Sequence, residues 1–258
     1  MICRYAVDEL IGLSADCRAV DSERFEKTTY RMNIIKQKAL SLIENAFGKS
    51  GRVLAVRAWE SAGFVEIDVH FPEMVMSGWE KVQHAKIKVG EGVYRDYTPA
   101  GWDNETHTCT LYVDTMHNGP GSTWASSLQV GDPITYVGVS NTFHKPLSGK
   151  MIVLGDMSAL GHYLALQQLA AGQSISGAIA VDEEDMAEFE STFRWNVKAV
   201  KKNDAGGLAS LLQWTQDIDL TNTEVFIAGH IPTGIQLRKE LKKRKDQPNS
   251  VRVQGFWS

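Results

Sequence analysis

The sequence has few cysteines and no long apolar run, and each absence excludes a class of protein. The 258 residues include three cysteines, Cys3, Cys17 and Cys109, with no C-x-x-C pair, so neither a disulfide framework nor a zinc knuckle is expected. No apolar stretch approaches the roughly 18 residues of a membrane span, and Arg4 and Asp8 fall where a signal peptide would be apolar. The sequence therefore predicts a cytoplasmic protein without a membrane partner.

An excess of basic residues is also lacking. Asp and Glu together number 31 against 27 Lys and Arg, and the pI is close to 6.0, which argues against a surface that binds nucleic acid. The seven histidines are scattered and none has the H-E-x-x-H spacing of two ligands on one metal. We therefore expect no nucleic-acid partner and no metal site.

Apolar periodicity divides the chain into three parts. A spacing of three and four over residues 26–47 predicts an amphipathic helix within an N-terminal extension, residues 1–48. Alternation then predicts an antiparallel β-barrel over residues 49–147, and alternating strands and helices predict a parallel α/β domain over residues 148–258. The expected barrel strands are 52–59, 63–71, 82–89, 108–114 and 134–139. The second domain is expected to have strands at 151–154, 175–181, 195–200, 224–228 and 251–256, and helices at 159–171, 185–193, 208–216 and 234–245.

An R-x-Y-T sequence, residues 95–98, closes one barrel strand and has the chemistry that a flavin needs. Arg95 offers a planar fork of donors to a phosphate, Tyr97 a flat ring and a hydroxyl, and Thr98 a hydroxyl for a ring nitrogen. The alternative is that Arg95 and Tyr97 form an ordinary cross-strand pair.

A glycine-containing loop about twenty residues later is suited to a pyrophosphate. Gly119 and Gly121 permit close approach of the backbone, so that successive N–H groups can form a cradle, and Ser122 and Thr123 add hydroxyls. The alternative is a plain Gly-Pro turn in which Ser122 caps a helix.

Together with Gly-Asp-Met-Ser-Ala at residues 155–159 and Gly-Phe-Trp at residues 255–257, these two segments resemble the siderophore-interacting protein family. Its members are FAD-dependent ferric-siderophore reductases of the ferredoxin-reductase-like group. The resemblance covers residues 50–257 and implies a flavin-binding barrel followed by a nucleotide-binding α/β domain. It also implies that NADH or NADPH reduces the flavin, which passes single electrons to Fe(III) so that Fe(II) leaves the siderophore.

The resemblance implies a set of binding residues and no acid, base or nucleophile. The FAD residues would be Arg95, Tyr97, Thr98, His117, Gly119, Gly121, Ser122, Thr123 and Trp124. Those on the nicotinamide side would be Gly155, Asp156, Ser158, Gly229 and His230, and Trp257 would lie near the flavin. The sequence departs from the family pattern in two places. A second arginine after the R-x-Y-T is absent, so flavin phosphate binding is expected to be weaker or differently arranged. Residues 157–158 lack the usual Glu-Thr pair, which leaves the choice between NADH and NADPH open.

A cluster of basic residues on the last predicted helix offers a binding surface for the substrate. Ferric siderophores are commonly anionic, so Arg238, Lys239 and Lys242 are expected to attract them. A simpler interpretation is a solvated helix end whose cations favour the helix dipole. Two other functions are open: a general NAD(P)H-dependent flavin or quinone reductase, and a flavin- or siderophore-binding module reduced by a partner protein.

Overall fold

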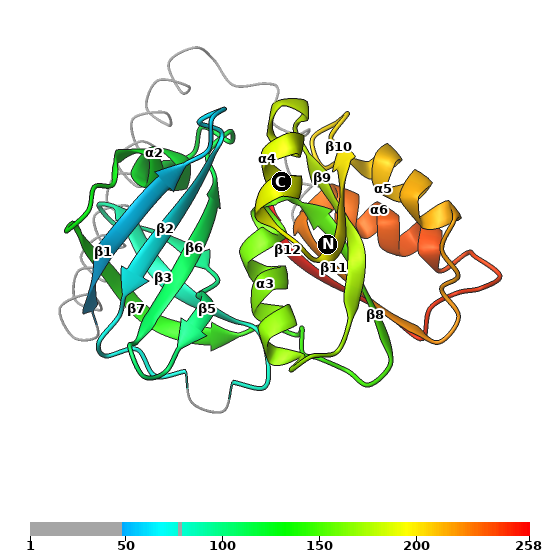
Figure 1. Ribbon diagram of the computed structural model, residues 1–258, viewed down its shortest axis with the longest axis horizontal. Helices are drawn as coiled ribbons and strands as arrows, with labels where there is room; N and C mark the ends of the chain where they lie inside the picture. The colour runs from blue at the N-terminus through cyan, green and yellow to red at the C-terminus, as the bar shows by residue number, and fades with distance from the viewer. Residues whose placement is uncertain (1–47, 77–78) are drawn as a thin grey trace, which may run out of the picture. The chain divides into compact units, whose positions relative to one another are not determined.

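The computed structural model describes residues 48–76 and 79–258, which form an antiparallel and a parallel β-sheet (Figure 1). The helix predicted at residues 26–47 lies outside the described residues. No helix in the described ranges is long and apolar enough to cross a membrane.

Seven strands in the order β4-β3-β7-β1-β2-β6-β5 form the first sheet, and every neighbouring pair is antiparallel. They are β1 (Lys49–Ala58), β2 (Phe64–His70), β3 (Gln83–Gly90), β4 (Val93–Tyr97), β5 (Ala100–Asp103), β6 (Thr108–Asp114) and β7 (Pro133–Asn141). Alternate residues such as Ile67, Val69 and Leu111 are buried on one face, because side chains of a strand point to opposite faces in turn. Helix α2 (Pro120–Ser127) connects β6 to β7.

Five parallel strands in the order β10-β9-β8-β11-β12 form the second sheet. They are β8 (Lys150–Asp156), β9 (Ile175–Val181), β10 (Asn196–Lys201), β11 (Thr223–His230) and β12 (Ser250–Trp257). In chain order this is 3-2-1-4-5, so the direction of winding reverses between β8 and β11. Open α/β sheets bind ligands in the crevice at the carboxyl ends of such a pair.

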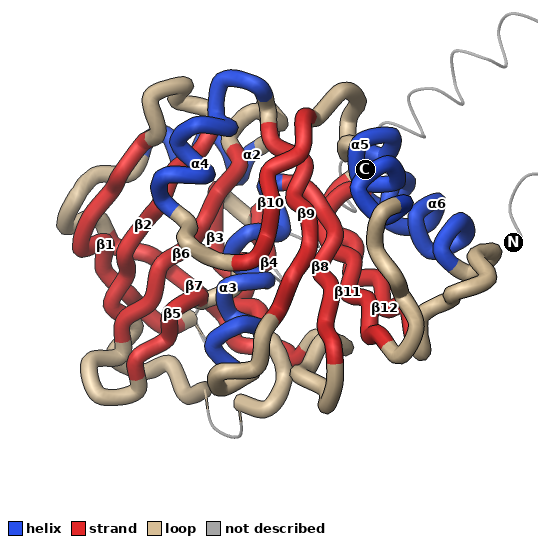
Figure 2. The backbone as a smooth tube through the Cα atoms, turned by 45° about the vertical axis from the view of Figure 1, so that its right-hand side comes forward, coloured by secondary structure: helices blue, strands red, loops and turns tan. Residues whose placement is uncertain are grey.

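Helices cover both faces of the parallel sheet, as Figure 2 shows. They are α3 (Leu160–Leu169) and α4 (Met186–Thr192) on one face, and α5 (Leu208–Gln216) and α6 (Ile231–Leu241) on the other. Short 3₁₀ helices, Met157–Ala159 and Glu183–Asp185, precede α3 and α4.

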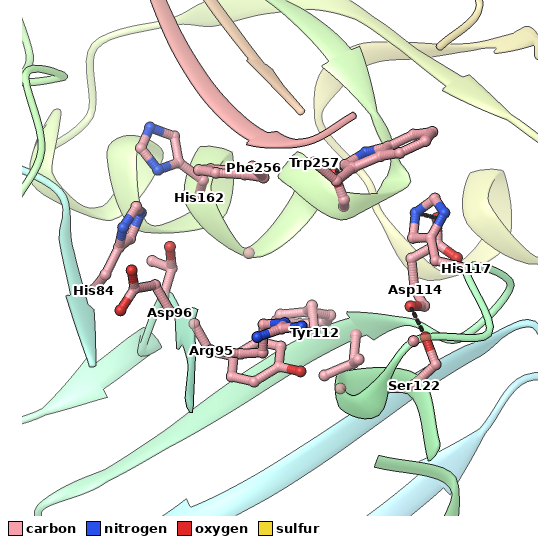
Figure 3. Close-up of a pocket in the computed structure, with 17 residues that line it drawn as sticks. His84, Arg95, Asp96, Tyr112, Asp114, His117, Ser122, His162, Phe256 and Trp257 are labelled. Atoms are coloured by element: carbon pink, nitrogen blue, oxygen red, sulfur yellow. Dashed lines mark hydrogen bonds and ion pairs between the residues drawn. The ribbon is translucent and has the colours of Figure 1, made fainter. Parts of the chain in front are cut away.

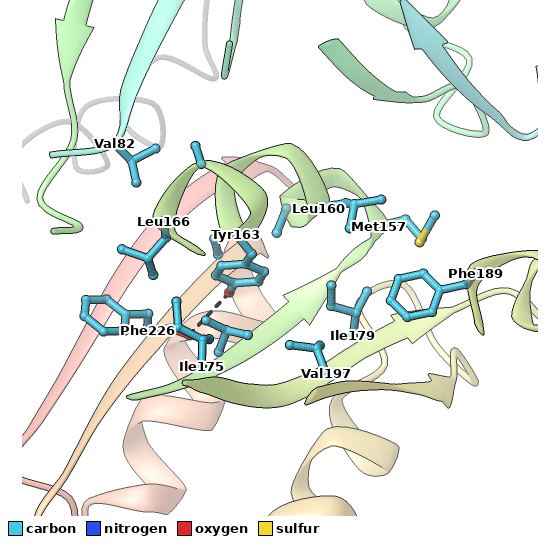
Figure 4. Packing of buried hydrophobic residues seen from close by; sticks show 14 of the residues in the cluster. Val82, Met157, Leu160, Tyr163, Leu166, Ile175, Ile179, Phe189, Val197 and Phe226 are labelled. Atoms are coloured by element: carbon cyan, nitrogen blue, oxygen red, sulfur yellow. Dashed lines mark hydrogen bonds between the residues drawn. The ribbon is translucent and has the colours of Figure 1, made fainter. Parts of the chain in front are cut away.

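One apolar core joins the two sheets. Leu160, Tyr163 and Leu166 of α3 pack with Phe226 of β11 and with Val82, which precedes β3 of the antiparallel sheet (Figure 4). The buried Tyr163 hydroxyl donates to the backbone carbonyls of β8 and β11, so its polar group is satisfied. The shared core fixes the carboxyl end of the parallel sheet against the antiparallel one.

The predicted fold class is confirmed, and the predicted strands of both sheets are present. The helix predicted at residues 234–245 is wrong in both bounds, because α6 begins at Ile231 and ends at Leu241. Pro232 is the reason for the early start: proline is compatible with the first turn of a helix, where its missing N–H costs nothing. The sequence also did not predict β5, which is only four residues long.

Candidate functional site

A pocket lies where β4, the β6–α2 loop, the start of α3 and the end of β12 meet (Figure 3). Nine of the residues predicted from the sequence line it: Arg95, Tyr97, Thr98, His117, Gly119, Gly121, Ser122, Ser158 and Trp257. These come from both sheets and from segments more than 150 residues apart, so the fold brings the separate motifs to one place.

Strand β4 is an edge strand and presents the R-x-Y-T residues to the pocket. Arg95 is exposed and donates a hydrogen bond to the Tyr94 carbonyl over 2.8 Å. The Tyr97 ring stacks on Trp124 of α2 with 5.5 Å between ring centroids, and burial raises the pKa of its hydroxyl. Tyr97 is therefore a rigid, neutral flat surface, while Arg95 supplies an accessible charge.

The loop between β6 and α2 is held by Asp114 at its start. The Asp114 carboxylate accepts a hydrogen bond from the Met116 backbone N–H over 3.0 Å and pairs with His117 Nε2 at 3.1 Å. This contact raises the pKa of His117, although burial opposes the shift. Asn118 has a φ of 49°, the left-handed conformation that turns the chain toward α2.

The N-terminus of α2 faces the same pocket. Its N-cap is Gly119, which has no side chain to cap the helix. Pro120 has no N–H, so the donors available to an anion in the first turn are the backbone N–H groups of Gly121 and Ser122. Gly121 is required by space: a Cβ there would lie 2.5 Å from the Tyr97 hydroxyl oxygen. The glycine allows the helix to approach the tyrosine this closely.

These residues fit a flavin dinucleotide. Arg95 and the uncapped N-terminus of α2 provide a guanidinium and backbone donors for phosphate groups, and Tyr97 provides an aromatic surface for a ring system. Among the described residues, no group of three or more His, Cys, Asp or Glu side chains is arranged to hold a metal ion.

The carboxyl ends of β8 and β11 meet beside the pocket, and Asp156 lies between them. Its buried carboxylate accepts hydrogen bonds from the backbone N–H of His230 at 2.7 Å and of Ser158 at 3.0 Å. Burial raises the pKa of Asp156, and these hydrogen bonds oppose the shift. Gly229 has a φ of 113°, and a Cβ there would lie 2.4 Å from Asp156 Oδ2, so glycine is required at this contact.

Trp257 closes this side of the pocket. Its ring lies between the imidazoles of His117 and His230, with centroid distances of 4.0 and 4.3 Å, and its indole N–H donates to the Ser158 hydroxyl over 3.2 Å. The tryptophan thus contacts the β6–α2 loop on one side. On the other it contacts residues at the carboxyl ends of β8 and β11, where the direction of winding reverses and which we call the switch point.

Several predicted residues do not line the pocket. Trp124 and Asp156 support residues that do, and Gly155, His230 and Gly229 surround Asp156 at the ends of β8 and β11. The Thr123 hydroxyl donates to the Gly119 carbonyl within α2. The predicted substrate residues Arg238, Lys239 and Lys242 are exposed at the last turn of α6, whose 11 residues span about 16 Å from the switch point.

The sequence did not predict about half of the lining residues. They are His84, Asp96, Tyr112, Val113, Asp114, Gly161, His162 and Phe256. Asp96 and Asp114 lie inside or beside the recognised motifs, so proximity was a usable signal for them. His84 and His162 carry no motif, and only the packing of β3 against α3 brings them to the pocket.

Comparison with known proteins agrees with this geometry. Residues 54–141 match the family model of the siderophore-interacting FAD-binding domain, which confirms the resemblance drawn from the sequence over this part of the chain. No curated protein sequence matches the chain.

Solved structures with the same fold include siderophore-interacting and ferredoxin-reductase proteins. The siderophore-interacting protein of Acinetobacter baumannii is 19% identical with a TM-score of 0.64, covering 81% of this chain and 90% of its own. A siderophore utilization protein from T. fusca is 19% identical with a TM-score of 0.61, covering 81% and 92%. The ferredoxin-NADP⁺ reductase of Plasmodium falciparum is 13% identical with a TM-score of 0.60, covering 83% and 97%. At these identities the likeness establishes a ferredoxin-reductase-like fold.

Proposed function

We propose that this protein is an FAD-containing reductase that takes electrons from NADH or NADPH and passes them to the iron of a ferric siderophore, releasing Fe(II). One observation carries the proposal: Arg95 and Tyr97 share a pocket with Ser158 and Trp257 at the switch point of the parallel sheet. A flavin bound there would lie beside the crevice where such sheets bind nucleotides. FAD, when bound, supplies the ability to accept two electrons together and to release them one at a time.

The site residues predicted from the sequence would bind and orient the cofactors rather than act as acids or bases. Arg95 and the α2 N-terminus would hold the flavin phosphates, Tyr97 would lie against the ring, and Thr98, which is buried in the same pocket, would face a ring nitrogen. The proposal assigns FAD to residues 49–147 and the nicotinamide cofactor to residues 148–258. It places the protein in the cytoplasm, which agrees with its few cysteines.

The test is the visible spectrum of purified protein supplied with FAD, followed through three anaerobic steps. We expect a bound-flavin spectrum that bleaches with NADH or NADPH and recovers when a ferric siderophore is added, with Fe(II) trapped by a chromogenic chelator. Recovery with a quinone but not with the siderophore would identify a general reductase instead. Absence of a flavin spectrum would overturn the proposal.

A second candidate, a flavin module reduced by a partner protein, is favoured by the contacts of Asp156. Its carboxylate and the Trp257 ring occupy the space between the ends of β8 and β11, where a nicotinamide would have to enter. A flavin that dithionite bleaches but neither nicotinamide does would support this candidate. Trp257→Ala would then distinguish a covered nicotinamide site, which the variant opens, from a site that is lost.

A further inference from the structure

Three buried histidines from different parts of the fold form a row at one end of the pocket. His84 is on β3, His144 is in the segment between β7 and β8, and His162 is on α3. His144 Nδ1 and His162 Nε2 are 2.7 Å apart, and the ring centroids of His84 and His162 are 5.7 Å apart. We call these residues the histidine row.

The row is part of the pocket wall. His84 and His162 both line the cavity that holds Tyr97 and Thr98, and Figure 3 shows them side by side at the end opposite His117 and Trp257. The Phe256 ring lies edge-on to both imidazoles, with 5.5 Å between centroids. A ligand that extends from the phosphate end of the pocket over Tyr97 therefore reaches this row.

Three nitrogens of the row are buried without a hydrogen-bond partner: His84 Nε2 and His162 Nδ1, whose residues line the pocket, and His144 Nε2 behind them. Buried polar atoms are nearly always paired, so an unpaired one calls for an explanation such as a bound group. Each neutral imidazole has one donor and one acceptor nitrogen, so His162 Nδ1 is an acceptor when His162 Nε2 donates to His144 Nδ1 and a donor when His162 Nε2 accepts from it. The row can thus both give and take a proton at the pocket.

We propose that the histidine row is the proton-exchanging group of the flavin pocket. When the bound flavin is reduced, the row takes up one proton from solvent, and when the flavin is reoxidised, the row returns it. This inference rests on the proposed function, because it requires a flavin in the pocket.

The charges balance in both directions. A hydride from a nicotinamide brings two electrons and one proton, so the ring that receives it gains one negative charge. One solvent proton on the row cancels this charge. Two successive transfers of one electron to Fe(III) leave the flavin oxidised, and both protons return to solvent. No further oxidant or reductant is needed.

The surroundings of the row set how readily it accepts the proton. Burial lowers the pKa of His84 to about 4 and of His144 to about 3, and it also lowers that of His162. Of the three, His84 is the favoured proton acceptor, because the Asp96 carboxylate raises its pKa. Lys86 acts in the opposite direction and lowers it. Arg252 lies beside His144, and each histidine disfavours a charge on its neighbours. A negative charge in contact shifts a pKa by about 1–3 units, which would raise the pKa of His84 from about 4 toward 7.

The experiment measures how many protons accompany flavin reduction. FAD-loaded protein is titrated with dithionite at several pH values between about 5 and 6.5, the range between the pKa of His84 beside oxidised flavin and the value raised by a negative charge, and the pH dependence of the midpoint potential gives protons per two electrons. We expect His162→Gln and His84→Gln to take up about one proton fewer than the wild type, since glutamine keeps the hydrogen bonds but does not titrate. His70→Gln, on β2 outside the pocket lining, is the matched control and should equal the wild type.

A second measurement needs no variant. Infrared difference spectra of reduced minus oxidised wild type, with and without ¹⁵N-labelled histidine, should contain isotope-sensitive imidazolium bands. Equal proton numbers in all proteins and no such bands would overturn the inference while leaving the flavin function intact. Dithionite makes the test independent of nicotinamide and siderophore, so protein that binds no FAD would instead overturn the proposed function, and this inference with it.

Discussion

At the scale of single residues, Arg95 is the side chain on which phosphate binding depends most. It is exposed and donates a hydrogen bond to the carbonyl of its neighbour Tyr94, so we expect its removal to leave the fold unchanged. We expect Arg95→Gln to weaken FAD binding by about tenfold to a hundredfold, because a charge-assisted phosphate contact is lost. Quenching of flavin fluorescence measures the affinity.

Riboflavin provides the control for this prediction, since it has the ring but no phosphate. Its affinity should be the same in the wild type and in Arg95→Gln, and Arg95→Lys should fall between them with FAD because it keeps charge but loses the planar fork. A variant that loses riboflavin as strongly as FAD would show that Arg95 holds the ring instead.

Gly121 and Gly119 allow a paired test of the loop. Gly121→Ala would put a Cβ 2.5 Å from the Tyr97 hydroxyl, whereas a Cβ at Gly119 meets nothing nearer than 4.0 Å. We expect Gly121→Ala to displace Tyr97 and weaken FAD binding by about tenfold or more, since overpacking typically costs about 1–3 kcal/mol. Gly119→Ala should bind FAD nearly normally. Equal losses would mean that the bound ligand also fills the space that a Cβ at Gly119 would take.

The residues that the sequence could predict are those whose role is local. Arg95, Tyr97 and the glycines of the loop are recognisable because a short segment contains the whole motif. His84 and His162 are not, because each is an ordinary residue of a strand or helix until β3 and α3 come together beside the pocket. Their position depends on tertiary packing, for which a single sequence has no local signal.

At the scale of elements, the basic end of α6 is expected to act at a distance. Arg238, Lys239 and Lys242 lie about 10 to 17 Å along the helix from its start at the switch point and do not line the pocket. We expect the triple variant to glutamine to lower kcat/KM for an anionic ferric siderophore severalfold at about 10 mM salt, where screening is weak, and to have no effect at about 0.5 M. Steady-state rates at the two salt concentrations measure this.

An uncharged quinone is the control acceptor, because the field of the helix does not attract it. Its rate should be unchanged by the triple variant at both salt concentrations. A loss that persists in high salt would indicate direct contact of these side chains with the substrate, and no loss at all would support the simpler interpretation of a solvated helix end.

Most elements could be predicted because their patterns are strong. The strands of the parallel sheet are buried on both faces and appear as short apolar runs, such as residues 151–154 and 225–228. The errors fall at ends and in short pieces: α6 begins three residues early because Pro232 suits a first turn, and β5 has too few residues to alternate visibly.

At the scale of the whole described structure, the site exists because two sheets share a core. Leu160 and Tyr163 pack in one cluster with Phe64 of β2 and Phe226 of β11, which holds the R-x-Y-T strand against the switch point. The sequence predicted the order of the two domains, but not the 3-2-1-4-5 strand order that places Asp156 beside His230. Strand order depends on pairings between distant segments, which periodicity does not report.

The histidine row makes the stability of this arrangement depend on pH. His84 and His144 have folded pKa values of about 4 and about 3, below the ordinary 6.5, so the unfolded chain binds their protons first. Their contribution is complete above about pH 6.5 and is lost as the pH falls toward these folded values. From pH 7 to pH 5 we expect urea denaturation to show a loss of about 2 kcal/mol for each of the two.

His117 acts in the opposite direction, because Asp114 raises its pKa and its protonation favours the folded state. The comparison that isolates the row is therefore between the wild type and His84→Gln/His144→Gln, which keeps His117. The double variant should lose about 4 kcal/mol less than the wild type between pH 7 and pH 5, even where its stability at pH 7 is lower. Equal losses in the two proteins would mean that the two histidines have the same pKa in the folded and the unfolded state, and that burial does not keep the row neutral.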